Sequence, residues 1–270
     1  MFMGTPEIAI PSLEKLHEKH EICTIITGVD KPRGRGQKLT PTPVAEWGAA
    51  HNIDVIKPDT FKDEAFLPVL EKYNPEIIVV IAYGKILPKY VLDYPQKAIN
   101  IHFSLLPKYR GAAPVQRAII NGENETGVSV QLMAEKLDAG DILHTIKTQI
   151  HEFETSGELF ERLGILGAEA IDFTLGNLES IKPLHQDESE ASLAPMLTKE
   201  DSLIDFSKTP GEIINHIRGY NPHPAARMTY NGDVLKVFSA KINNGELEIL
   251  EIQPPNKGKM LYSDYLRGLK

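Results

Sequence analysis

Segments with the hydrophobic pattern of strands alternate with segments that have the pattern of helices along the first 180 residues. Apolar runs at 22–26 and 76–82 are typical of strands, and the second is continuous, as in a strand covered on both faces. Residues 44–50 and 61–73 have the spacing of helices, although Pro68 interrupts the second. These segments predict strands and helices that follow one another along the chain.

The alternation continues with strand-like segments at 98–101, 128–133 and 142–150. Thr155 and Glu158 then have the spacing of a capping box, which predicts the start of a long helix. Positions 159, 160, 163, 166, 170, 171 and 174 are spaced like one face of that helix, and all of them except Thr174 are apolar. Strands that alternate with helices predict a Rossmann-like, doubly wound α/β sheet.

The pattern changes after residue 182. Residues 183–200 are polar without periodicity, which predicts a linker. Beyond it, 210–219 has a helical pattern, and 234–240 and 246–252 are strand-like. The C-terminal region is therefore expected to be a second, smaller domain rich in β-structure.

Composition narrows the class of protein. A hydrophobic content of 41% with 24% charged residues is ordinary for a globular protein. The longest apolar run, residues 77–82, is too short to span a bilayer, and the N-terminus does not have the pattern of a signal peptide. Cys23 is the only cysteine, which excludes an intrachain disulfide and a cysteine-cluster zinc site. We therefore expect a cytoplasmic protein with no membrane partner.

Candidate chemistry is concentrated around residue 100. Asn100 and His102 are two apart at the end of a predicted strand, so their side chains lie on the same face. In open α/β sheets this carboxyl edge is where ligands bind. Asp138 adds a carboxylate, so an oxyanion donor and groups that move protons are available. Taken singly, each residue is equally consistent with a strand end, a partly buried histidine or a turn.

A second candidate feature is the basic loop at residues 31–38. It contains Lys31, Arg33, Arg35 and Lys38, with two glycines, one proline and no acidic residue. Such a loop can contact the phosphates of a nucleic acid. The net charge of −8 argues against a long RNA-binding surface, and a solvated surface loop is the alternative interpretation.

Together, these motifs resemble the folate-dependent formyltransferase superfamily over nearly the whole chain. The trio around Asn100 is specific to the superfamily, whereas the basic loop and the C-terminal region are similar to its members that act on aminoacyl-tRNA. The segments that carry the resemblance are Phe2-Met-Gly-Thr-Pro-Glu7, Ala82-Tyr-Gly-Lys-Ile-Leu-Pro88, Asn100-Ile-His-Phe-Ser-Leu-Leu-Pro-Lys-Tyr-Arg-Gly111, Glu125-Thr-Gly-Val128, Leu137-Asp-Ala-Gly-Asp141 and Thr198-Lys-Glu-Asp201.

The resemblance implies an enzyme that transfers the formyl group of 10-formyltetrahydrofolate to the α-amino group of methionyl-initiator-tRNA, for translation initiation. It implies a catalytic domain at 1–182, a linker at 183–200 and an OB-like tRNA-binding barrel at 201–270. A monomer that needs no metal is expected.

The resemblance also implies roles for individual residues. Asn100, His102 and Asp138 are the expected catalytic residues. The expected folate-binding residues are Tyr83, Gly84, Ile86, Leu87, Ser104, Leu105, Leu106 and Pro107. The expected tRNA-binding residues are Lys31, Arg33, Arg35 and Lys38.

The chain departs from the superfamily pattern at two places. It begins near the end of the expected first strand, and residues 241–245 join two strands where the family has a longer connection. We therefore expect either that segments are missing from this sequence or that the C-terminal barrel is truncated.

Three rival functions remain open. A glycinamide ribonucleotide formyltransferase would share the trio, but a glycine-rich phosphate loop would follow its first strand and it would lack a second domain. A formyltransferase for amino-sugar nucleotides would lack the basic loop. A non-catalytic RNA-binding module is a third possibility, and the intact trio argues against it.

Overall fold

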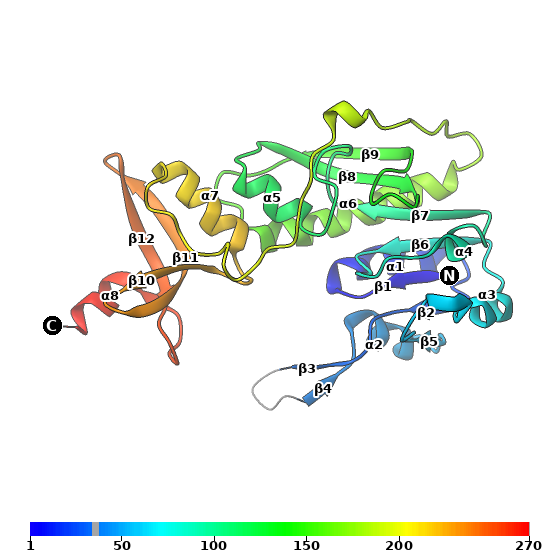
Figure 1. Cartoon of the computed structure of the whole chain (residues 1–270), viewed down its shortest axis with the longest axis horizontal. Helices are drawn as coiled ribbons and strands as arrows, with labels where there is room; N and C mark the ends of the chain where they lie inside the picture. The colour runs from blue at the N-terminus through cyan, green and yellow to red at the C-terminus, as the bar shows by residue number, and fades with distance from the viewer. Residues whose placement is uncertain (34–37, 270) are drawn as a thin grey trace. The chain divides into compact units, whose positions relative to one another are not determined.

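The computed structural model describes residues 1–33 and 38–269, and the chain separates into two compact units (Figure 1). Each unit is assembled from segments that are distant in the sequence. Unit 1 consists of Met1–Arg110, Gly127–Lys147 and Glu161–Leu193. Unit 2 consists of Gly111–Thr126, Thr148–Phe160 and Ala194–Lys270.

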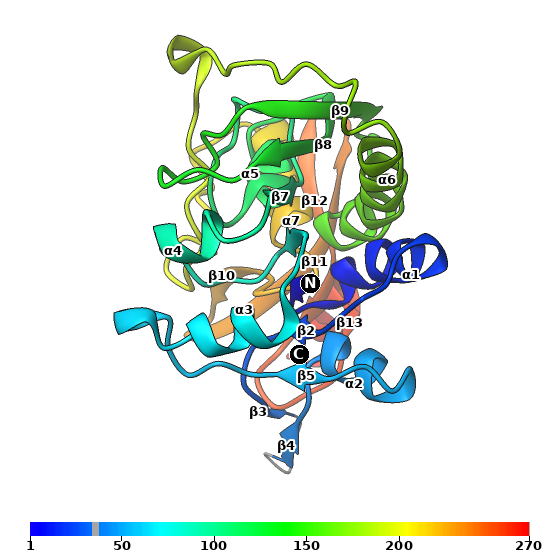
Figure 2. The same ribbon diagram turned by 90° about the vertical axis from the view of Figure 1, so that its right-hand side faces the viewer.

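Within the described ranges, seven strands form one sheet in the order β5-β2-β1-β6-β7-β8-β9 (Figure 1). Figure 2 shows β7, β8 and β9 following one another at one side of this sheet. In chain order, these strands are β1 (Phe2–Gly4), β2 (Ile25–Ile26), β5 (Val55–Ile56), β6 (Ile77–Ile81), β7 (Lys97–His102), β8 (Glu125–Leu132) and β9 (Ile142–Gln149). Every strand predicted in this part of the sequence is present, with shifts of a few residues at its ends.

The sheet is mixed, and its parallel part places the ends of several strands at one edge. β1 pairs in parallel with both β2 and β6, and β6 pairs in parallel with β7. β8 is antiparallel to β7. The chain therefore builds outward from β1 in one direction and then returns to its other side, which confirms the predicted doubly wound α/β arrangement. Ligands of such sheets bind at the carboxyl edge near this reversal.

The main helices of this part of the chain are α1 (Ile10–Lys19), α2 (Pro43–Ala50), α3 (Leu67–Tyr73), α4 (Lys89–Leu92) and α6 (Ser156–Gly176). The capping box predicted for α6 is confirmed, because the backbone N–H of Thr155 donates to the Glu158 carboxylate at 2.8 Å and the N–H of Glu158 donates to the Thr155 hydroxyl at 3.4 Å. Among the described helices, none is long and apolar enough to cross a membrane.

The predicted helix at 61–73 is wrong in its first half. Pro68 lies in the first turn of α3, where its missing N–H does no harm. A helix that began at residue 61 would place the same proline in its interior, where it would remove a hydrogen bond. Residues Lys62–Glu64 form a short 3-10 turn instead, with Asp63 in the left-handed region at a φ of 51°.

The core of the sheet follows from the apolar alternation of β6 and β7. Ile78 and Val80 of β6 are buried in one hydrophobic cluster with Phe66 and Leu70 of α3. On β7, Ile101 points toward α6, where Gly167 leaves space for its side chain. A Cβ at that glycine would lie 3.5 Å from Ile101, so the helix approaches the strand closely. Asn100 and His102, which alternate with Ile101 along the strand, consequently point away from α6.

Unit 2 contains an antiparallel sheet in the order β10-β11-β12-β13, which confirms the expected small β domain. Its strands and helices are β10 (Ala226–Tyr230), β11 (Asp233–Asn243), β12 (Glu246–Gln253), β13 (Met260–Leu261), α5 (Pro114–Ile120), α7 (Pro210–Tyr220) and α8 (Tyr262–Arg267). One face of α7 packs on this sheet through Ile213, Ile217 and Tyr220.

The short connection at 241–245 is a tight hairpin turn. Asn243 pairs directly with Glu246, and the two residues between them, Asn244 and Gly245, have φ values of 52° and 84°. Positive φ at both central residues is the requirement of the two-residue hairpin turn, which Asn-Gly meets better than most dipeptides. After a register shift around Ser239, the two strands pair regularly from Ala240 up to this turn.

Candidate active site

Four polar side chains share one face at the end of β7 and the facing part of β8. Asn100 is the register partner of Gln131, and His102 is the partner of Ser129. Directly opposite residues of an antiparallel pair lie on the same face of the sheet. The structure thus adds a second amide and a hydroxyl to the amide and imidazole that the sequence predicted.

His102 is held by a backbone carbonyl. Its side chain is 6% exposed, and Nε2 lies 2.8 Å from the carbonyl oxygen of Tyr109. A carbonyl only accepts hydrogen bonds, so Nε2 carries a proton and donates it there. Nδ1 faces Asp138 Oδ2 at 3.7 Å, which is an electrostatic contact and too long for a hydrogen bond. The Tyr109 carbonyl therefore fixes the tautomer of the neutral ring.

Asn100 is half-buried and lies two residues before His102 on the same face. In the described part of the chain, its side-chain amide has no hydrogen-bond partner. A partly buried amide without a protein partner is suited to donate to a bound molecule. This is the property that an oxyanion donor requires.

Asp138 occupies a constrained loop beside this face. Its φ is 49°, a left-handed conformation that is uncommon for residues other than glycine. Gln131 Nε2 donates to Asp138 Oδ1 at 3.2 Å, which leaves Oδ2 toward His102. Gly140 packs on β8, where an added Cβ would collide with the carbonyl oxygen of Leu132. The structure therefore brings the three predicted catalytic residues to one place.

The loop that contains the predicted folate-binding residues 104–107 is fixed by Ser129. The Ser129 hydroxyl accepts a hydrogen bond from the backbone N–H of Leu106 at 3.1 Å and donates to the carbonyl of Ser104 at 2.7 Å. The Ser104 hydroxyl in turn donates to the carbonyl of Lys108 at 2.6 Å. Leu105 is half-buried, so the loop presents apolar surface on a rigid backbone next to His102.

The other predicted folate-binding loop follows β6, and its residues do not all face outward. Leu87 and Tyr83 are buried, and Tyr83 lies in the hydrophobic cluster with its ring 6.1 Å from that of Phe61. Burial raises the pKa of Tyr83 to about 12. Ile86 is 86% exposed, and a Cβ added at Gly84 would meet nothing within 4 Å. Of these four predicted residues, Gly84 and Ile86 are exposed, whereas Tyr83 and Leu87 are buried.

The basic loop is a β-hairpin of unit 1. Its strands are β3 (Lys31–Arg33) and β4 (Lys38–Thr40), paired antiparallel with Arg33 in register with Lys38. Lys31 and Lys38 are exposed. Arg35 lies outside the described residues, as does the side chain of Arg33.

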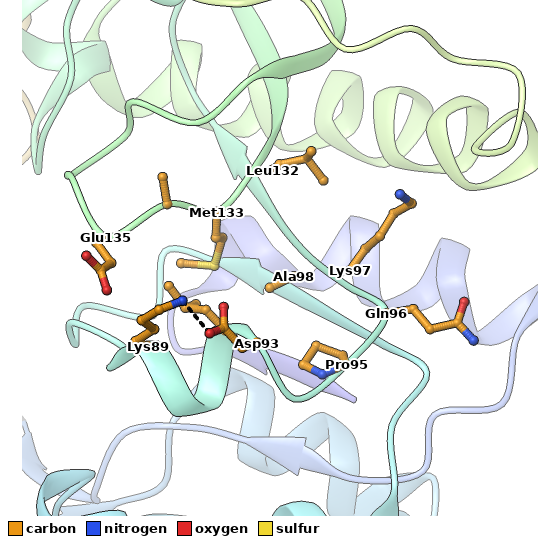
Figure 3. Close-up of a pocket in the computed structure, with 11 residues that line it drawn as sticks. Lys89, Asp93, Pro95, Gln96, Lys97, Ala98, Leu132, Met133 and Glu135 are labelled. Carbon is orange, nitrogen blue, oxygen red and sulfur yellow. Dashed lines mark hydrogen bonds and ion pairs between the residues drawn. The ribbon is translucent and has the colours of Figure 1, made fainter.

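A cavity of about 570 Å³ lies at the opposite end of β7 from His102 (Figure 3). Its walls include Lys97 and Ala98 at the start of β7 and Leu132 at the end of β8. At its rim Lys89 and Asp93 form an ion pair. Positive and negative groups alternate around this cavity, so it does not favour a ligand of either charge. Its lining does not include Asn100, His102 or Asp138.

The sequence did not single out several residues that complete the site. Ser129 and Gln131 had a signal, because they are the polar positions of an otherwise apolar predicted strand at 128–133. Arg110 and Gln186 had none, since a buried arginine and a glutamine within a polar linker look like surface residues. Both of them contact the loop of Asp138 or its partners, as described below.

Comparison with known proteins places the chain in a family. A family model described as formyl transferase matches residues 2–172, and one described as the formyl transferase C-terminal domain matches residues 196–246. The chain therefore belongs to the formyl transferase family.

Similar proteins narrow this class further. The methionyl-tRNA formyltransferase of Clostridioides difficile is 41% identical over 99% of this chain and 96% of its own. The structure of a methionyl-tRNA formyltransferase from Clostridium thermocellum has a TM-score of 0.67 at 21% identity, covering 95% of this chain and 98% of that one. The structure of HypX from Aquifex aeolicus in complex with tetrahydrofolic acid has a TM-score of 0.62 at 19% identity, covering 81% of this chain and 43% of that one.

Proposed function

We propose that this protein transfers the formyl group of 10-formyltetrahydrofolate to the α-amino group of methionyl-initiator-tRNA, the step that prepares this tRNA for translation initiation. The observation that carries the proposal is the convergence of Asn100, His102 and Asp138 at the carboxyl edge of the sheet. It occurs in a chain that is 41% identical to a methionyl-tRNA formyltransferase over nearly its full length.

The reaction forms one C–N bond and breaks another. The neutral amine of the aminoacyl-tRNA attacks the formyl carbon, and the carbonyl oxygen becomes an oxyanion in the tetrahedral intermediate. The intermediate collapses as the bond to N10 of the folate breaks. One proton leaves the attacking nitrogen and one reaches N10, so no net proton is consumed.

Each member of the trio has a role that its contacts support. The amide of Asn100, which has no partner among the described residues, donates to the oxyanion. His102 uses Nε2 for the Tyr109 carbonyl, so it can donate toward the substrate only from Nδ1 of the doubly protonated ring. The carboxylate of Asp138 compensates the positive charge of that ring and attracts the proton that leaves the amine, directly or through water.

The folate co-substrate would lie between the loop at 104–107 and the outward-facing residues Gly84 and Ile86. A flat pterin requires a rigid polar backbone and apolar contacts. The hydrogen bonds of Ser129 hold the first loop rigid, and Leu105 supplies apolar surface. The absence of neighbours around the Cα of Gly84 leaves room at the second loop.

The tRNA would contact the basic hairpin and the C-terminal β domain. Lys31 and Lys38 are exposed cations, and Arg33 and Arg35 lie between them in the sequence. We assign the C-terminal domain, whose sheet is β10-β11-β12-β13, an OB-like architecture and the second part of the tRNA surface. The protein acts as a cytoplasmic monomer in this proposal.

A formylation assay tests the proposal against its rivals. Labelled 10-formyltetrahydrofolate is offered with methionyl-initiator-tRNA, uncharged initiator tRNA, glycinamide ribonucleotide and an amino-sugar nucleotide in parallel. We expect label only on the methionyl-tRNA, in a form that is released as formylmethionine by mild base.

Each rival has its own outcome. Transfer to glycinamide ribonucleotide or to the amino sugar, without transfer to methionyl-tRNA, would show that the proposed acceptor is wrong. Binding of tRNA without any transfer would indicate a non-catalytic RNA-binding module.

A further inference from the structure

The linker between the two domains contributes to the catalytic loop. Leu184 and Ile142 exchange two backbone hydrogen bonds of 2.8 Å, which fix the linker beside the start of β9. Two residues further on, Gln186 is 2% exposed although the surrounding sequence is polar. A glutamine is rarely buried to this extent unless its amide is fully hydrogen-bonded.

The NH₂ group of Gln186 holds the backbone around Asp138. Gln186 Nε2 lies 2.6 Å from the carbonyl oxygen of Gly140 and 2.9 Å from that of Asp138. A non-glycine residue at a φ of 49° persists only where its surroundings hold the backbone in that conformation. Gln186 supplies such surroundings by donating to the carbonyl of Asp138 itself and to that of Gly140, two residues later.

A chain of two amides runs from Gln186 to the carboxylate of Asp138. Gln186 Nε2 also approaches Gln131 Oε1 at 3.3 Å, and Gln131 Nε2 donates to Asp138 Oδ1 at 3.2 Å. Gln131 is buried like Gln186. The carboxylate is therefore oriented from the sheet side while its other oxygen faces His102.

Arg110 fixes the direction of this chain. Its Nε and Nη2 donate to Gln186 Oε1 at 3.1 and 2.8 Å. Because a guanidinium has donors and no acceptor, Gln186 must turn its oxygen to Arg110 and its NH₂ group to the loop. Gln131 must then turn its oxygen to Gln186 and its NH₂ group to Asp138. One buried arginine thus determines which end of each amide faces which partner.

Arg110 is in turn held by the linker. It is 3% exposed, and its Nη1 donates to Glu188 Oε1 at 2.9 Å. Its backbone N–H donates to the carbonyl of Ser192 at 2.8 Å. A buried guanidinium requires such partners, so its position depends on the linker residues.

We propose that Gln186 is a positioning residue for Asp138, acting through the Asp138 and Gly140 carbonyls and through Gln131, with Arg110 setting the orientation of both amides. The inference rests on the proposed function, because it assigns Asp138 a part in formyl transfer. It makes the linker a component of the active site as well as a connection between domains.

The substitution Gln186→Glu tests this role with little change in volume. The new carboxylate can pair with Arg110, so the linker keeps its anchor, but the donors to the two loop carbonyls are lost. We expect kcat to fall about 10- to 100-fold, since small displacements of a catalytic group can reduce the rate by about 10². The Michaelis constants for folate and tRNA should change less than twofold. Glu190→Gln, at an exposed position of the same linker, is the matched control and should leave kcat unchanged.

A double-mutant cycle separates positioning from general damage. If Gln186 acts through Asp138, Gln186→Glu should have no further effect on kcat in an Asp138→Ala background. A full additional loss in that background would overturn the inference, as would a kcat of Gln186→Glu equal to that of the wild type. If Gln186→Glu does not fold, Gln131→Met carries the same test, because it removes the hydrogen bond to Asp138 Oδ1. A wild-type protein that does not formylate methionyl-tRNA would instead refute the proposed function.

Discussion

At the scale of single residues, a few contacts determine which polar atoms of the site already have a protein partner. The Tyr109 carbonyl occupies one nitrogen of His102, and Asp138 faces the other. The amide of Asn100 is without a partner in the described residues and lies on the same face of β7. The imidazole therefore has one atom available for chemistry, and the amide has both of its N–H groups.

The first prediction concerns the trio itself. Asn100→Ala should lower kcat by about 10²–10³, because that is the typical effect of removing one oxyanion donor. His102→Ala and Asp138→Ala should reduce kcat by comparable factors, and the double variants should lose less than the product of the single effects. Steady-state formylation kinetics and circular dichroism measure turnover and folding together.

Asn243→Ala, at an exposed position of β11, is the control for these variants. It should keep the wild-type kcat. If the alanine variant of one of these three residues has a near-normal kcat, that residue is not catalytic.

At the scale of elements, helix ends and strand partners decide where the functional segments lie. α7 begins with a capping box in which the Thr209 hydroxyl accepts from the N–H of Glu212 at 3.3 Å. The same helix packs on the β11 strand through Ile213 and Ile217. Its stability is therefore tied to that of the C-terminal sheet.

A cap variant tests this connection. Thr209→Ala should lower the free energy of unfolding by about 1 kcal/mol, because one N–H at the start of α7 loses its acceptor. Thr209→Ser keeps the hydroxyl and should lose only a fraction of this amount. Urea unfolding followed by circular dichroism measures the difference. Thr229→Ala, at an exposed position of β10, should leave the helix intact, and an equal loss in both alanine variants would contradict the cap's contribution.

His216 makes the stability of the same helix dependent on pH. Burial lowers the pKa of His216 below its ordinary value of 6.5, and the ring stacks on Tyr220 at 4.5 Å. The unfolded chain therefore binds the proton at a higher pH than the folded chain. The stabilisation is complete above about pH 6.5 and is lost as the pH falls through the lowered pKa.

His216→Gln should flatten this dependence. The melting temperature of the wild type should decrease more between pH 7.5 and pH 5.5 than that of the variant, because glutamine has no proton to bind in this range. His223→Gln, at an exposed position after α7, is the matched control. A variant with the same pH slope as the wild type would show that other groups cause the decrease.

At the scale of the whole molecule, the distribution of charge is the main question. The protein carries a net charge of −8, yet residues 31–38 contain four cations and no acid. A protein with a negative net charge repels a polyanion over most of its surface. A local basic segment can still attract the polyanion to one place. The charge pattern thus favours limited, local contacts to tRNA.

Neutralising the hairpin tests its role. Replacing Arg33, Arg35 and Lys38 by glutamine should raise the Michaelis constant for tRNA and leave that for folate unchanged. Each lost phosphate contact should reduce the salt slope of tRNA binding by about one unit or less. Arg35→Lys should rescue only in part, because lysine lacks the bidentate fork of arginine.

The control for the hairpin variant removes the same charge elsewhere. Lys62, Lys72 and Lys182 are exposed, and their replacement by glutamine should change neither quantity. If the hairpin variant behaves like this control, a tRNA contact at the hairpin is refuted.

The sequence by itself determined the features that depend on local periodicity. The apolar run that begins at Ile77 determined one central strand, because burial on both faces requires continuous hydrophobicity. The apolar residues on either side of Asn100 indicated the neighbouring strand. The two-residue spacing of Asn100 and His102 placed both on one face, which is a property of any strand. The capping box at Thr155 fixed the start of α6 through hydrogen bonds within a few residues.

Only the tertiary structure decided which distant groups meet. Gln186 lies 48 residues from Asp138 in the sequence. Its hydrogen bonds to Arg110 and to the carbonyls of the Asp138 loop could not be predicted from the sequence. Tyr83 belongs to the loop that the sequence predicted to bind folate, but its ring packs in the hydrophobic cluster beside Phe61. Side-chain partners across a fold depend on chain packing in three dimensions, whereas periodicity records only which face of one element is buried.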